Sequence, residues 1–110
     1  MEGRPCVRRA EVWWAELPSP AGSRPVVILT RDAVLSTIGS IVVTLVTRTE
    51  RGLPTEIVLG RRQGLPVQCV ANLDNIVTVP RNRLKRLMGA CDAEKVAELN
   101  EAIKTALDVR

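Results

Sequence analysis

The sequence predicts a small, mainly β domain of the α+β class: a barrel-like antiparallel sheet with a C-terminal α-helix packed on it. Short β-branched runs separated by Gly- and Pro-containing turns favour antiparallel strands. A single amphipathic pattern near the C-terminus favours one helix. The 110 residues suit one hydrophobic core. We expect residues 1–9 to form a flexible N-terminal arm and residues 10–110 to form a single domain.

The first strand is expected over residues 10–17, with Val12 and Trp14 on one face and Trp13 on the other. The two tryptophans are the only aromatic residues, so Val, Leu and Ile must build most of the core. Exposing both indoles is unfavourable, and we therefore expect one of them over a groove or at an interface. Burial in the core is the expectation for Trp14.

Further strands are expected along the middle of the chain. Prolines and a glycine in residues 18–23 form a turn, and an apolar run follows in residues 25–30. Asp32 is expected to cap one helical turn through Leu35. Residues 41–47 form the strongest β-branched run, which predicts a central strand buried on both faces.

The second half begins with a polar loop over residues 48–54 and a short strand over residues 56–59. A basic turn bounded by glycines spans residues 60–64. Residues 67–79 predict one bent or bulged strand, or two short ones, which end at Pro80.

Residues 81–87 predict a basic helical turn. Asp92 then begins the one clear helix as its N-cap, with Glu94 favourable in the first turn. The apolar residues of this helix recur at spacings of three and four and form one face: Val96, Leu99, Ile103 and Leu107.

Charge is unevenly distributed along the chain, whose formal net charge is +4. Residues 1–91 hold 13 Lys and Arg against 7 Asp and Glu, and all but one of these cations are arginine. Residues 92–110 hold 3 against 5. An arginine-rich body favours a polyanionic partner, of which nucleic acid is the obvious one.

Several functional classes find no support in the residues. The chain has no histidine, which removes the commonest general base and metal ligand. Cys6, Cys69 and Cys91 form no metal-binding spacing, so we expect reduced structural cysteines in a cytoplasmic protein. No apolar run approaches the ~18 residues of a membrane span, and no secretory signal is recognisable. We expect no metal, no cofactor and no membrane association.

One phosphoryl chemistry needs neither metal nor histidine. RNA carries its own nucleophile, the 2′-hydroxyl, so the protein has only to align the attack and stabilise charge on the phosphate. Arg24 stands before the strand of residues 25–30, and Thr47 ends the strand of residues 41–47. If these strands pair antiparallel, both side chains lie at the same end of the sheet. A loop arginine and a threonine chosen for β propensity remain the plain alternatives.

The chain from residue 10 onward resembles the MazF/PemK-like toxin endoribonucleases. The likeness rests on the order and spacing of motifs rather than on any one of them. They are EVWWAEL at 11–17, SRPVVIL at 23–29, VTLVT at 43–47, LPTEIVL at 53–59, GLP at 64–66, LDNIVT at 73–78 and LMG at 87–89.

This resemblance implies an SH3-like antiparallel β-barrel that forms a homodimer and cleaves single-stranded RNA without metal. Cleavage would be sequence-specific and leave a 2′,3′-cyclic phosphate and a 5′-hydroxyl. A cognate antitoxin would block the RNA groove. The family's catalytic arginine falls on Arg24 and its catalytic threonine on Thr47, while the general base is unassigned. The residues expected to contact RNA are Ser23, Arg48, Arg51, Arg61, Arg62 and Asn75; the four arginines are equally explicable as solvated surface residues.

The chain departs from the family pattern at three places. The family usually has several residues between its Gly-Ser and Arg-Pro, whereas Ser23 here runs directly into Arg24. Arg48 stands where a serine is frequent, and residues 75–78 replace Gln-Ile-Arg-Thr with Asn-Ile-Val-Thr. We therefore expect specificity to differ from that of relatives at residues 18–23.

Two other functions fit the same fold. A gyrase-binding toxin resembling CcdB would act through a C-terminal tail that contains tryptophan, but this chain has no tryptophan beyond Trp14. A non-catalytic RNA-binding module would result if the short first loop had abolished turnover. Fold alone does not separate these functions, because function resides in the site.

Overall fold

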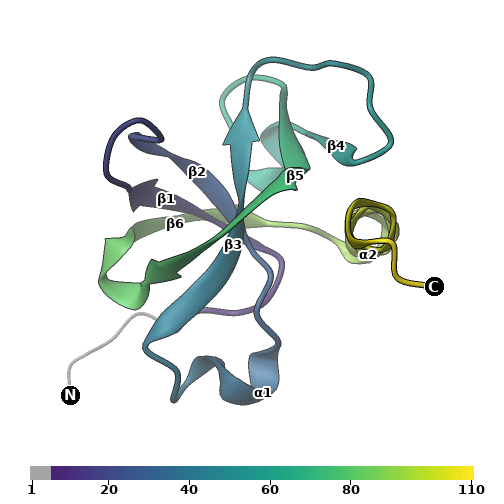
Figure 1. Cartoon of the computed structure of the whole chain (residues 1–110). Helices are drawn as coiled ribbons and strands as arrows, with labels where there is room; N and C mark the ends of the chain where they lie inside the picture. The colour runs from purple at the N-terminus through teal and green to yellow at the C-terminus, as the bar shows by residue number, and fades with distance from the viewer. Residues whose placement is uncertain (1–5) are drawn as a thin grey trace.

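The computed structural model describes residues 6–110 and shows a curled antiparallel sheet with a helix beside it (Figure 1). The strands are β1 (Glu11–Glu16), β2 (Ser23–Ile28), β3 (Ser40–Thr47), β4 (Glu56–Leu59), β5 (Cys69–Pro80) and β6 (Leu84–Ala90). The α-helices are α1 (Asp32–Leu35) and α2 (Ala93–Leu107), and the 3₁₀ turns are η1 (Arg61–Gln63) and η2 (Arg81–Arg83). None of the helices in the described residues is long and apolar enough to cross a membrane.

The six strands form one sheet in the order β4-β5-β3-β2-β1-β6, and every neighbouring pair is antiparallel. In β5 the register jumps. Thr44 of β3 lies opposite Ile76, and the next β3 residue, Leu45, lies opposite Asn72. The strand is therefore bulged over residues 73–75, as one of the two sequence-based alternatives proposed. The predicted mainly β, SH3-like barrel with a C-terminal helix is confirmed.

Hydrophobic packing covers both faces of the curled sheet. Consecutive residues of β1 point to opposite faces, so Val12 joins the cluster beneath α2 while Trp13 joins the cluster that includes Leu35 of α1. β3 is buried along most of its length, as expected for the central strand. The two clusters therefore pack against opposite faces of the curled sheet.

Of the two tryptophans of β1, Trp13 rather than Trp14 is the buried one. Trp13 is only 4% exposed, and its indole N–H donates to Glu11 Oε1 at 3.0 Å. Trp14 is partly exposed and lines a groove. The expectation that one indole lies over a groove is confirmed, but the expectation that Trp14 is the core residue is wrong. Alternation assigns the two tryptophans to opposite faces of β1, but it does not show which of the two is covered by the rest of the fold. The face that buries Val12 is open at Trp14.

The predicted helical turn over residues 81–87 is also wrong. Only η2 is helical there, and the chain continues as β6, which pairs with β1. Leu84, Leu87 and Met88 have the i, i+3, i+4 spacing of a helix, but pairing with an open sheet edge prevails over this local pattern.

The two helix caps differ from each other. Asp92 caps α2 as predicted, since its Oδ1 accepts the Lys95 N–H at 3.0 Å. Asp32 is not a cap: Arg31 occupies the N-cap of α1, and the Asp32 carboxylate instead accepts the N–H of Arg9 at 2.7 Å. On the apolar face of α2, Leu99 is buried and Ala106 still packs against the core, but Leu107 is 58% exposed.

Residues 1–5 of the predicted arm lie outside the described residues. Val7 is buried in the core. Arg9 donates from Nε to the Leu29 carbonyl at 3.0 Å and from a terminal nitrogen to Asn100 Oδ1 at 2.9 Å. Packed structure therefore extends N-terminally of the boundary predicted at residue 10.

Candidate functional site

Arg24 and Thr47 lie across from each other at one end of the sheet. β2 pairs with β3 in a register that sets Val26 opposite Leu45. The antiparallel pairing expected from the sequence is therefore present, and Arg24 and Thr47 each lie two residues beyond the Val26–Leu45 pair on the two neighbouring strands. Both side chains line a cavity of about 890 Å³ and also a smaller neighbouring cavity of about 160 Å³. They therefore stand at the junction of two hollows that together form one groove.

Arg24 is held in place by the turn between β1 and β2. Its Nε donates to the carbonyl of Ala21 at 3.0 Å. That turn is closed by a hydrogen bond from the Gly22 N–H to the Pro18 carbonyl at 3.3 Å. The half-buried side chain is thus fixed through Nε, and its two terminal nitrogens remain available as a fork for an anion.

Thr47 ends β3 and is half-buried. Its hydroxyl oxygen accepts the backbone N–H of Thr49 at 3.2 Å. Because this bond uses an oxygen lone pair, the hydroxyl proton remains free to be donated. A hydroxyl donor and a guanidinium fork thus line the same two cavities.

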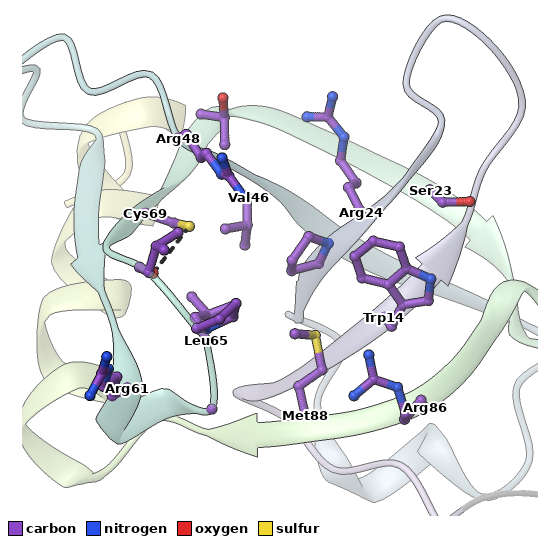
Figure 2. Close-up of a pocket in the computed structure, with 15 residues that line it drawn as sticks. Trp14, Ser23, Arg24, Val46, Arg48, Arg61, Leu65, Cys69, Arg86 and Met88 are labelled. Carbon is purple, nitrogen blue, oxygen red and sulfur yellow. Dashed lines mark hydrogen bonds between the residues drawn. The ribbon is translucent and has the colours of Figure 1, made fainter.

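The larger cavity has a cationic rim and an apolar floor (Figure 2). Four arginines from different elements line it: Arg24, Arg48, Arg61 and Arg86. No Asp or Glu is among the described residues that line it. The apolar part includes Trp14, Val46, Leu65 and Met88. Such a hollow concentrates positive potential and suits an anionic ligand that also carries flat apolar groups.

The smaller cavity is shaped by the bulge of β5 and the loop after β3. Asn75, a bulge residue, lines it together with Arg51. The bulge is braced because the Thr55 hydroxyl donates to Asp74 Oδ2 at 2.6 Å. The loop is braced by Glu56, whose Oε1 accepts the N–H of Arg51 at 3.0 Å and that of Leu53 at 3.2 Å. The carboxylates of Asp74 and Glu56, which do not line the cavity, thus hold in place the segments that carry Asn75 and Arg51.

Comparison with known proteins identifies the family. The family model described as "PemK-like, MazF-like toxin of type II toxin-antitoxin system" matches residues 8–107. The chain belongs to this family. It is 43% identical over 100 residues to the probable endoribonuclease MazF2 of Mycobacterium tuberculosis, and the match covers 90% of this chain and 93% of the relative.

Solved structures show the same fold. The Mycobacterium tuberculosis toxin MazF-mt6 superposes with a TM-score of 0.85 at 35% identity, covering 91% of this chain and 98% of that one. An endoribonuclease in complex with its cognate antitoxin from a mycobacterial species superposes with a TM-score of 0.83 at 26% identity, covering 94% and 97%. The fold and family inferred from the motif order are therefore confirmed.

Most of the RNA-contact residues proposed from the MazF-like pattern face the groove, but Arg62 does not. Ser23, Arg48 and Arg61 line the larger cavity, and Arg51 and Asn75 line the smaller one. Arg62 lies in a separate hollow beside α2, where a terminal nitrogen is 3.8 Å from Asp92 Oδ2. Arg61 lines this hollow as well as the larger cavity. Gln63 stabilises η1, since its Oε1 accepts the Gly60 N–H at 2.8 Å.

Several residues that line the groove were not among the RNA-contact residues expected from the sequence. Trp14, Arg86 and Met88 come from the β1–β6 pair, and Cys69 comes from the start of β5. The helix predicted over residues 81–87 is a strand from Leu84 onward, and in this strand Arg86 and Met88 both face the cavity. The pairing of Trp14 with Arg86 in the β1–β6 ladder then brings both to one wall.

The remaining thiols have different environments. Cys6, Cys69 and Cys91 are all free. Burial, together with the neighbouring Asp92 carboxylate, raises the pKa of Cys91 from its ordinary 9.0 to about 11. Within residues 6–110, no group of three His, Cys, Asp or Glu residues is arranged to hold a metal ion.

Proposed function

We propose that the protein is a toxin endoribonuclease that cleaves single-stranded RNA in this groove. The observation that carries the proposal is that Arg24 and Thr47, from the paired strands β2 and β3, both line the two neighbouring cavities. Among residues 6–110, five arginines and no carboxylate line the groove as a whole. Family membership and relatives named endoribonucleases support the same activity.

The chemistry proposed is an in-line attack by the 2′-hydroxyl of RNA on the adjacent phosphorus. The 2′-oxygen loses its proton and bonds to phosphorus, the bond from phosphorus to the 5′-oxygen breaks, and that oxygen takes up a proton. The products are a 2′,3′-cyclic phosphate and a 5′-hydroxyl. The terminal nitrogens of Arg24 and the hydroxyl of Thr47 donate to the non-bridging oxygens, where negative charge accumulates.

The side chains of the groove act mainly by alignment and charge stabilisation. The chain contains no histidine, and within the part of the chain that the structure describes no carboxylate lines either cavity. A guanidinium is a fixed cation and a poor proton acceptor. Arg24 is therefore assigned to the transition-state charge, and proton removal from the 2′-hydroxyl is left to solvent.

The proposal extends to partners and place of action. We propose that the protein works as a homodimer, in the cytoplasm where RNA is available, and that a cognate antitoxin covers the arginine-lined groove. A mycobacterial endoribonuclease of the same fold has been solved with its antitoxin. An acidic antitoxin segment would match the charge of the groove.

The test is cleavage of a long single-stranded RNA by the purified protein in EDTA. We expect cleavage at a short consensus with cyclic-phosphate ends, and loss of cleavage by at least about 100-fold in Arg24→Ala, the scale for losing one transition-state donor. Arg31→Ala is the matched control, because Arg31 is exposed and lines neither cavity of the groove. Equal cleavage by Arg24→Ala and the unmodified protein would refute the site. Tight RNA binding without product would instead support the non-catalytic module.

A further inference from the structure

Trp14 and Arg86 form one wall of the larger cavity. They are register partners in the β1–β6 ladder and both line the cavity. In Figure 2 they lie together on one side, with the Trp14 ring between Arg24 and Arg86, while Arg48 lies on the other side. A ligand in the cavity would therefore meet this pair as well as the Arg24–Thr47 junction.

Trp14 differs from its neighbour in what its indole touches. Trp13 is buried and its indole N–H is bonded to Glu11. Trp14 is partly exposed towards the cavity, and its indole N–H has no hydrogen-bond partner within residues 6–110. Trp13 thus serves the core, while Trp14 offers ring surface to a ligand. A flat apolar surface beside cations is the arrangement on which unpaired nucleobases stack.

Arg86 is an exposed cation at the edge of that surface. Within the described residues its guanidinium makes no hydrogen bond or ion pair. Its neighbour Lys85, which the register shift of the β1–β6 ladder leaves unpaired, lines neither cavity. Arg86 is therefore the group of β6 that can reach an anion bound in the groove.

We propose that Trp14 and Arg86 form a nucleotide subsite that positions single-stranded RNA next to the cleavage point. One unpaired base stacks on the Trp14 ring, and Arg86 binds a backbone phosphate of the same strand. The subsite rests on the proposed function, since it binds the substrate of that reaction. Trp14 and Arg86 are positioning residues, whereas Arg24 and Thr47 touch the reacting phosphate.

Binding is measured with an oligonucleotide that carries 2′-deoxyribose at the cleavage position and so cannot be cut. We expect the oligonucleotide to change the tryptophan emission of the unmodified protein. Trp14→Phe should abolish this change, because only the buried Trp13 remains. Trp14→Leu should weaken binding about tenfold, while Trp14→Phe, which keeps a ring, should retain most of the affinity.

The role of Arg86 is measured by salt dependence. Each phosphate contact to a single strand contributes about 0.7 to the slope of log affinity against log salt. We expect Arg86→Gln to lower that slope by about this amount. Lys85→Gln is the matched control, since it removes the same charge one residue away at an exposed position that lines neither cavity. It should change the slope by less than half as much.

Kinetics separate positioning from a merely structural role. With cleavable RNA, we expect Trp14→Leu and Arg86→Gln to raise KM, whereas Arg24→Ala lowers kcat. Circular dichroism and thermal unfolding establish that each variant is folded. Unchanged affinity and an unchanged salt slope in folded variants would overturn the subsite while leaving the proposed cleavage intact. An unmodified protein that neither binds nor cuts RNA would overturn both proposals.

Discussion

The hydroxyl oxygen of Thr47 accepts the backbone N–H of Thr49, at 3.2 Å, and this bond leaves the Thr47 hydroxyl proton free to be donated. Thr47→Val keeps the shape and β propensity of the residue but removes the donor. We expect the cleavage rate to fall about 100-fold or more, the scale for losing one donor to a developing charge. Thr47→Ser, which keeps the hydroxyl, should retain much of the cleavage rate. Thr105→Val on α2 is the control, and single-turnover cleavage is the measurement.

Glu56 organises the loop that carries Arg51, through the N–H groups of Arg51 and Leu53. Glu56→Ala leaves these groups to solvent. We expect faster hydrogen exchange at both amides and weaker RNA binding, by about fivefold, because each lost charge-assisted bond is worth about 1.5–3 kcal/mol and water replaces part of it. Glu50→Ala, in the same loop, controls for charge. Unchanged exchange at Arg51 and Leu53 would contradict this role.

Gly89 and Gly64 lie where β6 and the end of η1 touch. A Cβ on Gly89 would lie 2.2 Å from the Gln63 carbonyl oxygen, and a Cβ on Gly64 would lie 2.0 Å from the Met88 carbonyl oxygen. Since backbone would have to move, we expect Gly89→Ala to lower the free energy of unfolding by about 2 kcal/mol or more. At Gly39 a Cβ meets nothing within 4 Å. Gly39→Ala should therefore change the free energy of unfolding by less than about 0.5 kcal/mol. Urea unfolding measures both.

The raised pKa of Cys91 predicts that the free energy of unfolding falls at alkaline pH. Burial raises its pKa to about 11 in the folded protein, from an ordinary 9.0. Above pH 9 the unfolded chain therefore releases the proton first, and the free energy of unfolding falls as pH rises towards 11. Below pH 9 the group contributes nothing. Urea unfolding at pH 8 and pH 10 should show a smaller difference for Cys91→Ala than for the unmodified protein. Equal differences would contradict the assignment.

The absence of histidine and carboxylate from the groove predicts the pH profile of cleavage. We expect log kcat to rise with pH without a break between about pH 5 and 8, because no imidazole or carboxylate removes the 2′-proton. Rates with a fixed RNA across this range, at constant ionic strength, are the measurement. A plateau that begins near pH 6.5 would reveal a titrating base and contradict the solvent assignment.

The strands and the central pairing could be predicted because local pattern and tertiary structure agree. The β-branched run that ends at Thr47 and the turn before Arg24 leave antiparallel pairing as the simple arrangement, and the register follows from it. The N-cap at Asp92 was predictable for the same reason, since its carboxylate acts within one turn.

Other features depend on contacts distant in sequence. β6 exists because β1 offers it an open edge, while its own Leu and Met spacing favours a helix. The roles of Trp13 and Trp14 depend on what covers each face of β1. Arg61 and Arg62 are identical in type, yet Arg61 lines both the groove and the hollow beside α2, whereas Arg62 lines only that hollow. No local pattern carries that information.

The contact between Gly64 and Met88 has a consequence for how such proteins can diversify. It joins one wall of the groove to β6 by close packing, and residues 65–68 beside it belong to no strand ladder. An insertion there would lengthen the rim without shifting any register. The number of nucleotides that the groove accommodates can thus change independently of the sheet that carries Arg24 and Thr47.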